Sequence, residues 1–82
     1  MTLEDRIRAY ITNSGGLAAP PGDHDRLVDR GFVPSVRMLD LVGFLEDELH
    51  ITLRPVDLAP ENLATISAIA TMVRARLPDP GR

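Results

Sequence analysis

Apolar residues recur at intervals of three and four along three separate segments of this 82-residue chain. Such spacing places apolar side chains on one face of an α-helix, whereas a half-buried strand requires strict alternation. Alternation is weak and confined to residues 51–54, where Pro55 cuts it short. The periodicity constrains the fold more than any other feature. It predicts an all-α protein with helices over residues 2–13, 35–49 and 66–77.

The first and last of these segments carry their own end signals. Thr2, with Asp5 three residues later, is typical of a capping box, and the glycine pair at 15–16 is a natural stop. Thr65 is a good N-cap for the last helix, which Pro78 is expected to end. The predicted core stripes are Leu3, Ile7, Tyr10 and Ile11 in the first helix and Ile66, Ile69, Ala70, Val73 and Leu77 in the last.

The second segment, residues 35–49, has two chemically different faces when its residues are placed at about 100° intervals. The face expected to meet the core consists of Met38, Leu39, Val42, Leu45 and Leu49. The opposite face consists of Val36, Asp40, Gly43 and Asp47, flanked by Glu46 and Glu48. A charged outer face is usually solvated surface, so the pattern alone does not establish a docking role for these acids.

The connections between the helices differ in length. Residues 14–34 form a long first loop that must be pinned to the core, because long structureless loops are uncommon in compact domains. The expected anchors are Leu17, Leu27, Val28 and Phe32. Residues 56–63 are expected to form one or two helical turns, with Pro60 at a first helical position. The economical fold is a small four-helix bundle with a long first loop and a short third helix.

Length and composition exclude several functional classes. The chain is expected to form one domain over residues 1–77, followed by a flexible tail at 78–82, and its thin core argues against a large enclosed active site. It has no cysteine, which excludes disulfides, thiolate zinc sites and a cysteine nucleophile. A net charge of -3 and only three aromatic residues argue against nucleic-acid partners. No membrane span or signal peptide is evident, so we expect a cytoplasmic protein.

Two other chemistries lack the patterns they require. Asp23, His24 and Asp25 are adjacent and His50 is distant, so their spacing does not predict a metal site. Ser35 and His24 could be combined with an aspartate into a hydrolase triad, but the chain has no Gly-x-Ser-x-Gly nucleophile motif. We therefore expect neither a metal site nor an enzyme.

Ser35 stands at the predicted start of the second helix, after Pro34. One interpretation is that it is simply an N-cap, with its hydroxyl bonded to a backbone amide near Arg37 or Met38. A second interpretation is that it bears a phosphodiester. Such a group would lie at the positive end of the helix dipole, where Arg37 and Arg30 could add charge-assisted hydrogen bonds.

The segment from residue 27 to residue 49 resembles the signature region of acyl and peptidyl carrier proteins; it reads LVDRGFVPSVRMLDLVGFLEDEL. That family has an Asp-Ser-Leu-type motif at the start of its second helix, followed by an apolar, acid-punctuated helix that ends in an acidic run. The segment PENLATI at residues 60–66 is similar to the lead into the family's last helix. With the matching length and loop pattern, the resemblance covers nearly the whole chain, and it looks most like stand-alone carriers loaded by a ligase.

The resemblance implies a discrete carrier of acyl or aminoacyl groups. Ser35 aligns with the serine that receives 4'-phosphopantetheine from coenzyme A, whose thiol holds a biosynthetic intermediate as a thioester. Val36 aligns with an exposed apolar residue beside that serine, and Asp40, Glu46 and Asp47 align with acids that partner enzymes recognise. The implied partners are a phosphopantetheinyl transferase, an acyl- or aminoacyl-loading ligase and downstream synthase or transferase enzymes. A monomer is expected, because the serine and the second helix must stay exposed.

One residue departs from the family pattern. Pro34 occupies the position before the serine, where Asp is usual. The change removes a carboxylate that could assist the modifying enzyme's metal site, although proline is compatible with entry into a helix. An alternative function is therefore an unmodified protein-interaction module that keeps the carrier fold.

Overall fold

The computed structural model describes residues 2–77. These residues form three α-helices, α1 (Leu3–Gly15), α2 (Met38–Leu49) and α3 (Ile66–Arg76). Three short 3-10 helices, η1 (Ser35–Arg37), η2 (Pro55–Leu58) and η3 (Pro60–Asn62), complete the secondary structure of this range, which contains no strand. The prediction of an all-α protein is confirmed. None of the helices within residues 2–77 is long and apolar enough to cross a membrane.

The ends of α1 and α3 follow the predicted local signals. The hydroxyl of Thr2 accepts a hydrogen bond from the Asp5 amide at 3.1 Å, and the Asp5 carboxylate accepts one from the Thr2 amide at 3.3 Å. The helix ends at Gly16, whose φ of 62° is the left-handed conformation that glycine adopts without steric cost. The Thr65 hydroxyl caps α3 by accepting from the Ala68 amide at 3.0 Å. Pro78 and the predicted tail lie outside the described residues.

The periodicity predicts one continuous α-helix over residues 35–49, but the structure divides this segment into two helices. The chain enters as the 3-10 helix η1 and becomes α-helical at Met38. Arg37 marks the change, with φ -90° and ψ -5°, in the bridge region of backbone space. The Arg37 amide bonds to the Pro34 carbonyl at 2.8 Å, three residues back rather than four. Helix starts are often tightened in this way.

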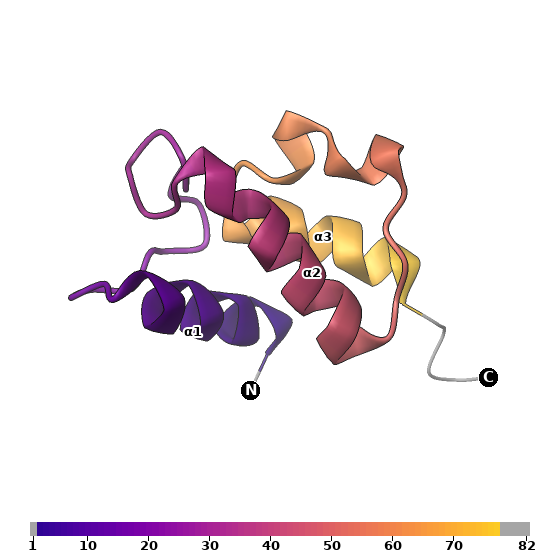
Figure 1. Ribbon diagram of the computed structural model, residues 1–82, viewed down its shortest axis with the longest axis horizontal. Helices are drawn as coiled ribbons and strands as arrows, with labels where there is room; N and C mark the ends of the chain where they lie inside the picture. Colours follow the sequence, from indigo (N-terminus) through magenta and orange to yellow (C-terminus); the bar gives the residue numbers. More distant parts are fainter. Residues whose placement is uncertain (1, 78–82) are drawn as a thin grey trace.

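Ion pairs show that α1 runs antiparallel to its two neighbours. Arg74 near the end of α3 donates two hydrogen bonds, of 2.6 and 2.7 Å, to Glu4 at the start of α1. Arg6, also near the start of α1, pairs with Glu48 at the end of α2 at 3.1 Å. In Figure 1, α2 crosses in front of α3, while α1 lies along one side of the pair.

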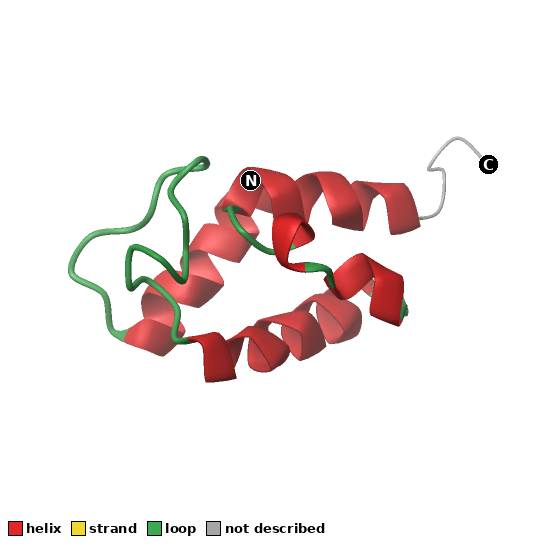
Figure 2. Cartoon of the chain, turned by 90° about the horizontal axis from the view of Figure 1, so that it is seen from above, coloured by secondary structure: helices red, strands yellow, loops and turns green. Residues whose placement is uncertain are grey.

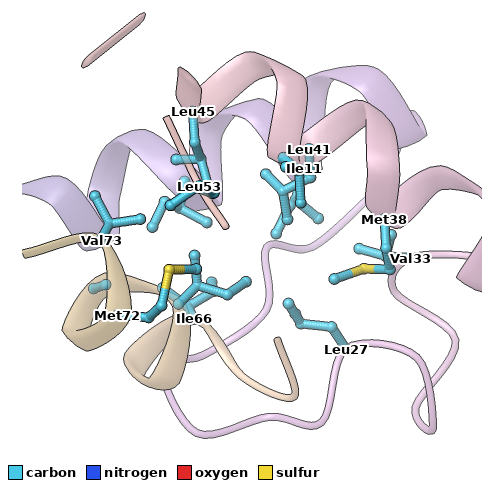
Figure 3. Packing of buried hydrophobic residues seen from close by; sticks show 14 of the residues in the cluster. Ile11, Leu27, Val33, Met38, Leu41, Leu45, Leu53, Ile66, Met72 and Val73 are labelled. Carbon is cyan, nitrogen blue, oxygen red and sulfur yellow. The ribbon is translucent and has the colours of Figure 1, made fainter. Parts of the chain in front are cut away.

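One apolar cluster joins the three helices and the connecting segments (Figure 3). Its fully buried large side chains include Ile7, Leu27, Leu41, Leu45, Ile66, Ile69 and Val73. The predicted stripes of α1 and α3 are confirmed at Ile7, Ile11, Ile66, Ile69, Ala70 and Val73, which are buried. Leu3, Tyr10 and Leu77 are partly buried and pack against the same cluster.

The prediction that α2 buries Leu39 is wrong, because this side chain is 71% exposed. The buried residues of α2 are Met38, Leu41, Val42 and Leu45. Met38 and Leu45 lie near the centre of that face, and Leu39 is rotated by about 100° from Met38. Leu41, which the predicted stripe omitted, is 1% exposed and belongs to the core.

The long first loop occupies one end of the molecule (Figure 2). Leu27 is fully buried, and its amide donates to the Ala64 carbonyl at 2.9 Å. Leu17 and Phe32 are half-buried against the core, so these three predicted anchors are confirmed. Val28 is 41% exposed, and its prediction as an anchor is wrong. Here Leu27 turns inward, and the next side chain is left at the surface.

Residues 55–62 form two successive 3-10 turns, η2 and η3, with Pro60 at the first position of η3. The predicted helical turns and the position of Pro60 are confirmed. Asp57 in η2 is only 5% exposed and accepts bonds from the Arg54 amide at 2.9 Å and from Arg76 of α3 at 2.9 and 3.1 Å. These bonds fasten η2 to the end of α3, a link that helical periodicity does not reveal.

Candidate functional site

Ser35 is exposed at the first position of η1. Neither η1 nor α2 has a side-chain capping hydrogen bond, so the structure does not support the interpretation of Ser35 as an N-cap. The capping position of η1 is Pro34 and that of α2 is Arg37, neither of which has a hydroxyl. The Ser35 hydroxyl is thus accessible and is not used to start either helix.

Positive charge lies close to Ser35 along the chain. Arg37 is exposed two residues after it, and Arg30 is exposed in the turn before Gly31. Neither arginine forms an ion pair with another residue in the range 2–77, unlike Arg6, Arg8 and Arg74. Neither guanidinium group is therefore neutralised by a carboxylate of the described chain.

Two large apolar side chains are exposed next to Ser35. Val36 is 80% exposed, as the pattern predicts, and Leu39 is 71% exposed. Single exposed apolar residues are common on protein surfaces. Here two occur within four residues of each other, beside the exposed carboxylate of Asp40. This exposure of Leu39 was not predicted from the sequence, because Leu39 was placed on the face of the helix that meets the core.

The acids of α2 divide into two groups. Asp40 and Asp47 are exposed and form no ion pair or side-chain hydrogen bond with the rest of the described chain. Glu46 is half-buried, and its carboxylate accepts a hydrogen bond from the Leu53 amide at 2.9 Å. Glu48 pairs with Arg6. Only the two aspartates are therefore fully available to an external partner.

Two hollows adjoin the start of α2. The first, of about 270 Å³, lies between the end of α1, the end of the long loop and the first residues of the second helix. Its lining includes Tyr10, Leu17, Phe32, Val33, Pro34, Arg37 and Asp40. The second, of about 340 Å³, is lined by Val28, Met38, Leu58, Pro60 and Leu63, among others. Residues on both sides of Ser35 in sequence line the first hollow.

The histidines do not form a reaction centre with Ser35. His24 lies in the long loop and His50 follows α2, and both are exposed. No group of three or more His, Cys, Asp or Glu side chains in the described part of the chain is placed to hold a metal ion. No hydrogen bond within residues 2–77 joins Ser35 to a histidine or a carboxylate.

No protein-family model, curated protein or solved structure matches this chain. The start of the second helix combines the exposed Ser35, the unpaired Arg37 and Asp40 and two exposed apolar side chains, while the unpaired Asp47 lies near the other end of α2.

Proposed function

We propose that this protein is a discrete carrier of acyl or aminoacyl groups. Ser35 is the attachment point of 4'-phosphopantetheine, and the thiol at the end of that arm holds a biosynthetic intermediate as a thioester. The protein presents this intermediate to partner enzymes and does not itself catalyse a reaction. A chain without cysteine needs a thiol from elsewhere for this chemistry.

The observation that carries the proposal is the position of Ser35. Its hydroxyl is exposed at a helix start, yet it caps neither η1 nor α2. A serine near a helix start usually caps the helix, and this bond stabilises the helix by about 1 kcal/mol. A hydroxyl that is accessible and makes no such bond is suited to modification. Transfer from coenzyme A would give a phosphodiester on the serine oxygen, while the nucleotide part leaves and the hydroxyl proton is lost.

The charges around Ser35 suit the product of that transfer. A phosphodiester carries one negative charge, and the unpaired Arg37 lies two residues away. Arginine binds phosphate oxygens through paired, charge-assisted hydrogen bonds. Arg30, five residues before Ser35, is exposed and also forms no ion pair with the described residues. We propose Arg37 as the main contact to the phosphate.

We also propose that the chain has the four-helix bundle fold of acyl carrier proteins. The helices α1, α2 and α3, together with the two 3-10 turns of residues 55–62, correspond to the four-helix bundle of acyl-carrier type. In this interpretation, η2 and η3 occupy the place of the short third helix. The ion pair of Asp57 with Arg76 supports it, because this contact holds the turns against α3 as a packed element.

Partner enzymes would dock on the start and outer face of α2. Val36 and Leu39 offer apolar contact, while Asp40 and Asp47 offer unpaired negative charge to basic surfaces. Charge complementarity of this kind speeds encounter while keeping the complex short-lived. Glu46 contributes to the same acidic face, although one of its oxygens is bonded to the Leu53 amide.

The proposed partners are a phosphopantetheinyl transferase, a ligase that loads the acyl or aminoacyl group, and downstream synthase or transferase enzymes. We propose that the carrier acts as a cytoplasmic monomer, since each partner must reach Ser35 and α2 in turn. Neither nucleic acid nor a membrane has a part in this function.

Pro34 favours a second candidate function. The residue before a carrier serine is usually an aspartate, and here a proline with φ -59° and ψ 142° leads into η1. A chain that lost this carboxylate could keep the bundle and its docking face without being modified. It would then act as a protein-interaction module through α2.

Intact mass spectrometry after co-expression with a broad-specificity phosphopantetheinyl transferase tests the first proposal. We expect a mass gain of one phosphopantetheine that disappears in Ser35→Ala. The matched control is Ser14→Ala, because the Ser14 hydroxyl is bonded to the Tyr10 carbonyl at 2.7 Å and should not be modified.

Absence of the mass gain with several transferases would overturn the carrier proposal for the native chain. A Pro34→Asp variant then separates the two candidates. If that variant becomes modified while the native chain does not, the fold is a carrier fold and the native protein is the unmodified module. Full biological activity of Ser35→Ala would support the same conclusion.

A further inference from the structure

The first hollow beside α2 combines an apolar lining with charged residues. Tyr10, Leu17, Phe32 and Val33 supply aromatic and aliphatic walls, and Arg37 and Asp40 contribute opposite charges. Pockets that bind small molecules also combine apolar walls with polar groups that orient the ligand, and in this hollow the polar share of the lining is large. The volume of about 270 Å³ is close to the lower end of the usual range. The hollow is therefore suited to a small group.

Its position ties this hollow to Ser35. Pro34 and Arg37, which flank η1 and the serine, both line it. The phosphate attached to Ser35 would therefore lie beside the hollow, and the flexible arm would fold back to bring the cargo at its end into it. The hydroxyl-bearing residues at the N-caps of α1 and α3, Thr2 and Thr65, both use their hydroxyls as caps.

The two charged residues of this hollow, Asp40 and Arg37, can bind different groups of a ligand. Asp40 forms no ion pair within residues 2–77, and neither does Arg37. A carboxylate accepts hydrogen bonds only, so an unpaired Asp40 suits an ammonium group. Arg37 donates only and suits the phosphate of the arm. The pair therefore distinguishes a cargo with a free amine from one without.

We propose that this hollow is a cargo pocket for a small hydrophobic aminoacyl group carried on the protein, with the α-ammonium of the cargo bound by Asp40. The inference rests on the proposed function and specifies its substrate class. The side chain of the aminoacyl group lies against Phe32, Tyr10 and Leu17. A long unbranched acyl chain exceeds the space, and a cargo without an amine leaves Asp40 without its ligand.

The test uses the full chain loaded on Ser35 by a broad-specificity transferase. The cargo is phenylalanyl-aminopantetheine, in which an amide replaces the labile thioester, and the comparison cargo is the 3-phenylpropanoyl analogue, which lacks only the amine. Protein bearing the unacylated arm provides the reference. Intact mass first establishes loading. NMR then compares the amide shifts of Gly31 and Phe32 and the methyl shifts of Leu17 and Val33 at the first hollow with the methyl shifts of Met38 and Leu63 at the second.

We expect the phenylalanyl cargo to shift these signals relative to the unacylated arm and the phenylpropanoyl cargo to shift them less. Asp40→Asn should reduce the phenylalanyl shifts by about half or more, because replacing a charge-assisted hydrogen bond with a weaker neutral one lowers the fraction of molecules whose cargo occupies the hollow. The control is Glu61→Gln, since Glu61 is exposed in η3 and lines neither hollow. That variant should leave the shifts unchanged.

The outcomes separate this inference from the proposed function. Loading without shifts at the first hollow overturns the cargo pocket and leaves the carrier role intact. Shifts confined to Met38 and Leu63 would assign the cargo to the second hollow and also overturn the inference. Equal shifts with and without the amine would remove the role of Asp40. Failure to load Ser35 overturns the proposed function, and the inference with it.

Discussion

The two ends of the second helix are built differently. At its start, from Ser35 to Asp40, Val36 and Leu39 are largely exposed and the charged side chains form no ion pair within residues 2–77. At its end, Glu46 accepts a hydrogen bond from Leu53 and Glu48 pairs with Arg6 of α1, whereas Asp47 between them forms no ion pair with the described residues.

The difference shows that similar residues on one helix can serve either the fold or a partner. The chain leaves the end of α2 through His50, with φ 54°, and residues 51 and 53 return their side chains to the core. Glu46 holds that return in place by accepting hydrogen bonds from the Leu53 amide at its carboxylate and from the Ile51 amide at its backbone carbonyl. The start of α2 follows the long loop, and its exposed side chains do not hold a neighbouring segment against the core. Its exposed groups are therefore the better candidates for recognition.

The largest expected effect contrasts a buried with an exposed leucine. Leu45→Ala removes a side chain that is 1% exposed and should destabilise the protein by about 2–5 kcal/mol. Leu39→Ala, at the exposed start, should change stability by no more than about 0.5 kcal/mol. Urea unfolding followed by circular dichroism measures both. A comparable loss in Leu39→Ala would show that the start of α2 is packed after all.

Acid should act on the paired carboxylates outside α2. The two hydrogen bonds from Arg74, and then the backbone amide at the start of α1, lower the pKa of Glu4 from 4.5 to about 2. The pKa of Asp57 is also lowered, mainly by the Arg54 amide and then by Arg76. Because the pKa of Glu4 is depressed in the folded state, its contribution to stability is present above about pH 4.5 and is lost as the pH falls toward 2; the contribution of Asp57 is likewise lost on acidification.

Unfolding measured at a series of pH values checks this expectation. The native protein should lose stability steadily between pH 4.5 and 2, and Glu4→Gln should lose less over the same window. Glu61→Gln is the control, since Glu61 forms no ion pair with the described residues. An equal pH slope in native protein and Glu4→Gln would contradict the assigned role of the Arg74 pair.

A smaller effect separates two neighbouring acids of α2. Glu46→Ala leaves the Leu53 amide without its acceptor and should cost about 1–2 kcal/mol. Asp47→Ala, one residue later and exposed, should stay within about 0.5 kcal/mol. Hydrogen exchange at the Leu53 amide gives a local readout, because it should quicken in Glu46→Ala only. Identical exchange in the two variants would mean that the Glu46 bond does not hold the 51–53 segment.

The smallest effect is expected at Ser35. Because its hydroxyl caps neither η1 nor α2, Ser35→Ala should change the free energy of unfolding by less than about 0.5 kcal/mol. Thr65→Ala provides the contrast, since the Thr65 hydroxyl caps α3 and its loss should cost about 1 kcal/mol. A loss at Ser35 equal to that at Thr65 would restore the capping interpretation.

Much of the fold followed from local patterns, but the candidate site followed only in part. The position of Ser35 at a helix start and the exposure of Val36 were predictable, because both depend on a few neighbouring residues. The exposure of Leu39 follows from the same periodicity, because Met38, Leu41, Val42 and Leu45 have the i, i+3, i+4, i+7 spacing of a buried stripe and Leu39 lies about 100° from Met38; the predicted stripe was wrong in taking Leu39 instead of Leu41. The engagement of Glu46 was hidden, because its partner Leu53 lies seven residues away in a non-helical segment.

The sequence by itself determined the all-α class, the capping of α1 and α3 and the turns around Pro60, because each depends on periodicity or on side chains within one turn. Only the tertiary structure decided which acids of α2 are bonded, that Asp57 is buried between Arg54 and Arg76, and that a hollow opens beside Ser35. These features bring together segments that are distant in the chain. Their energies depend on packing between elements, which no local pattern records.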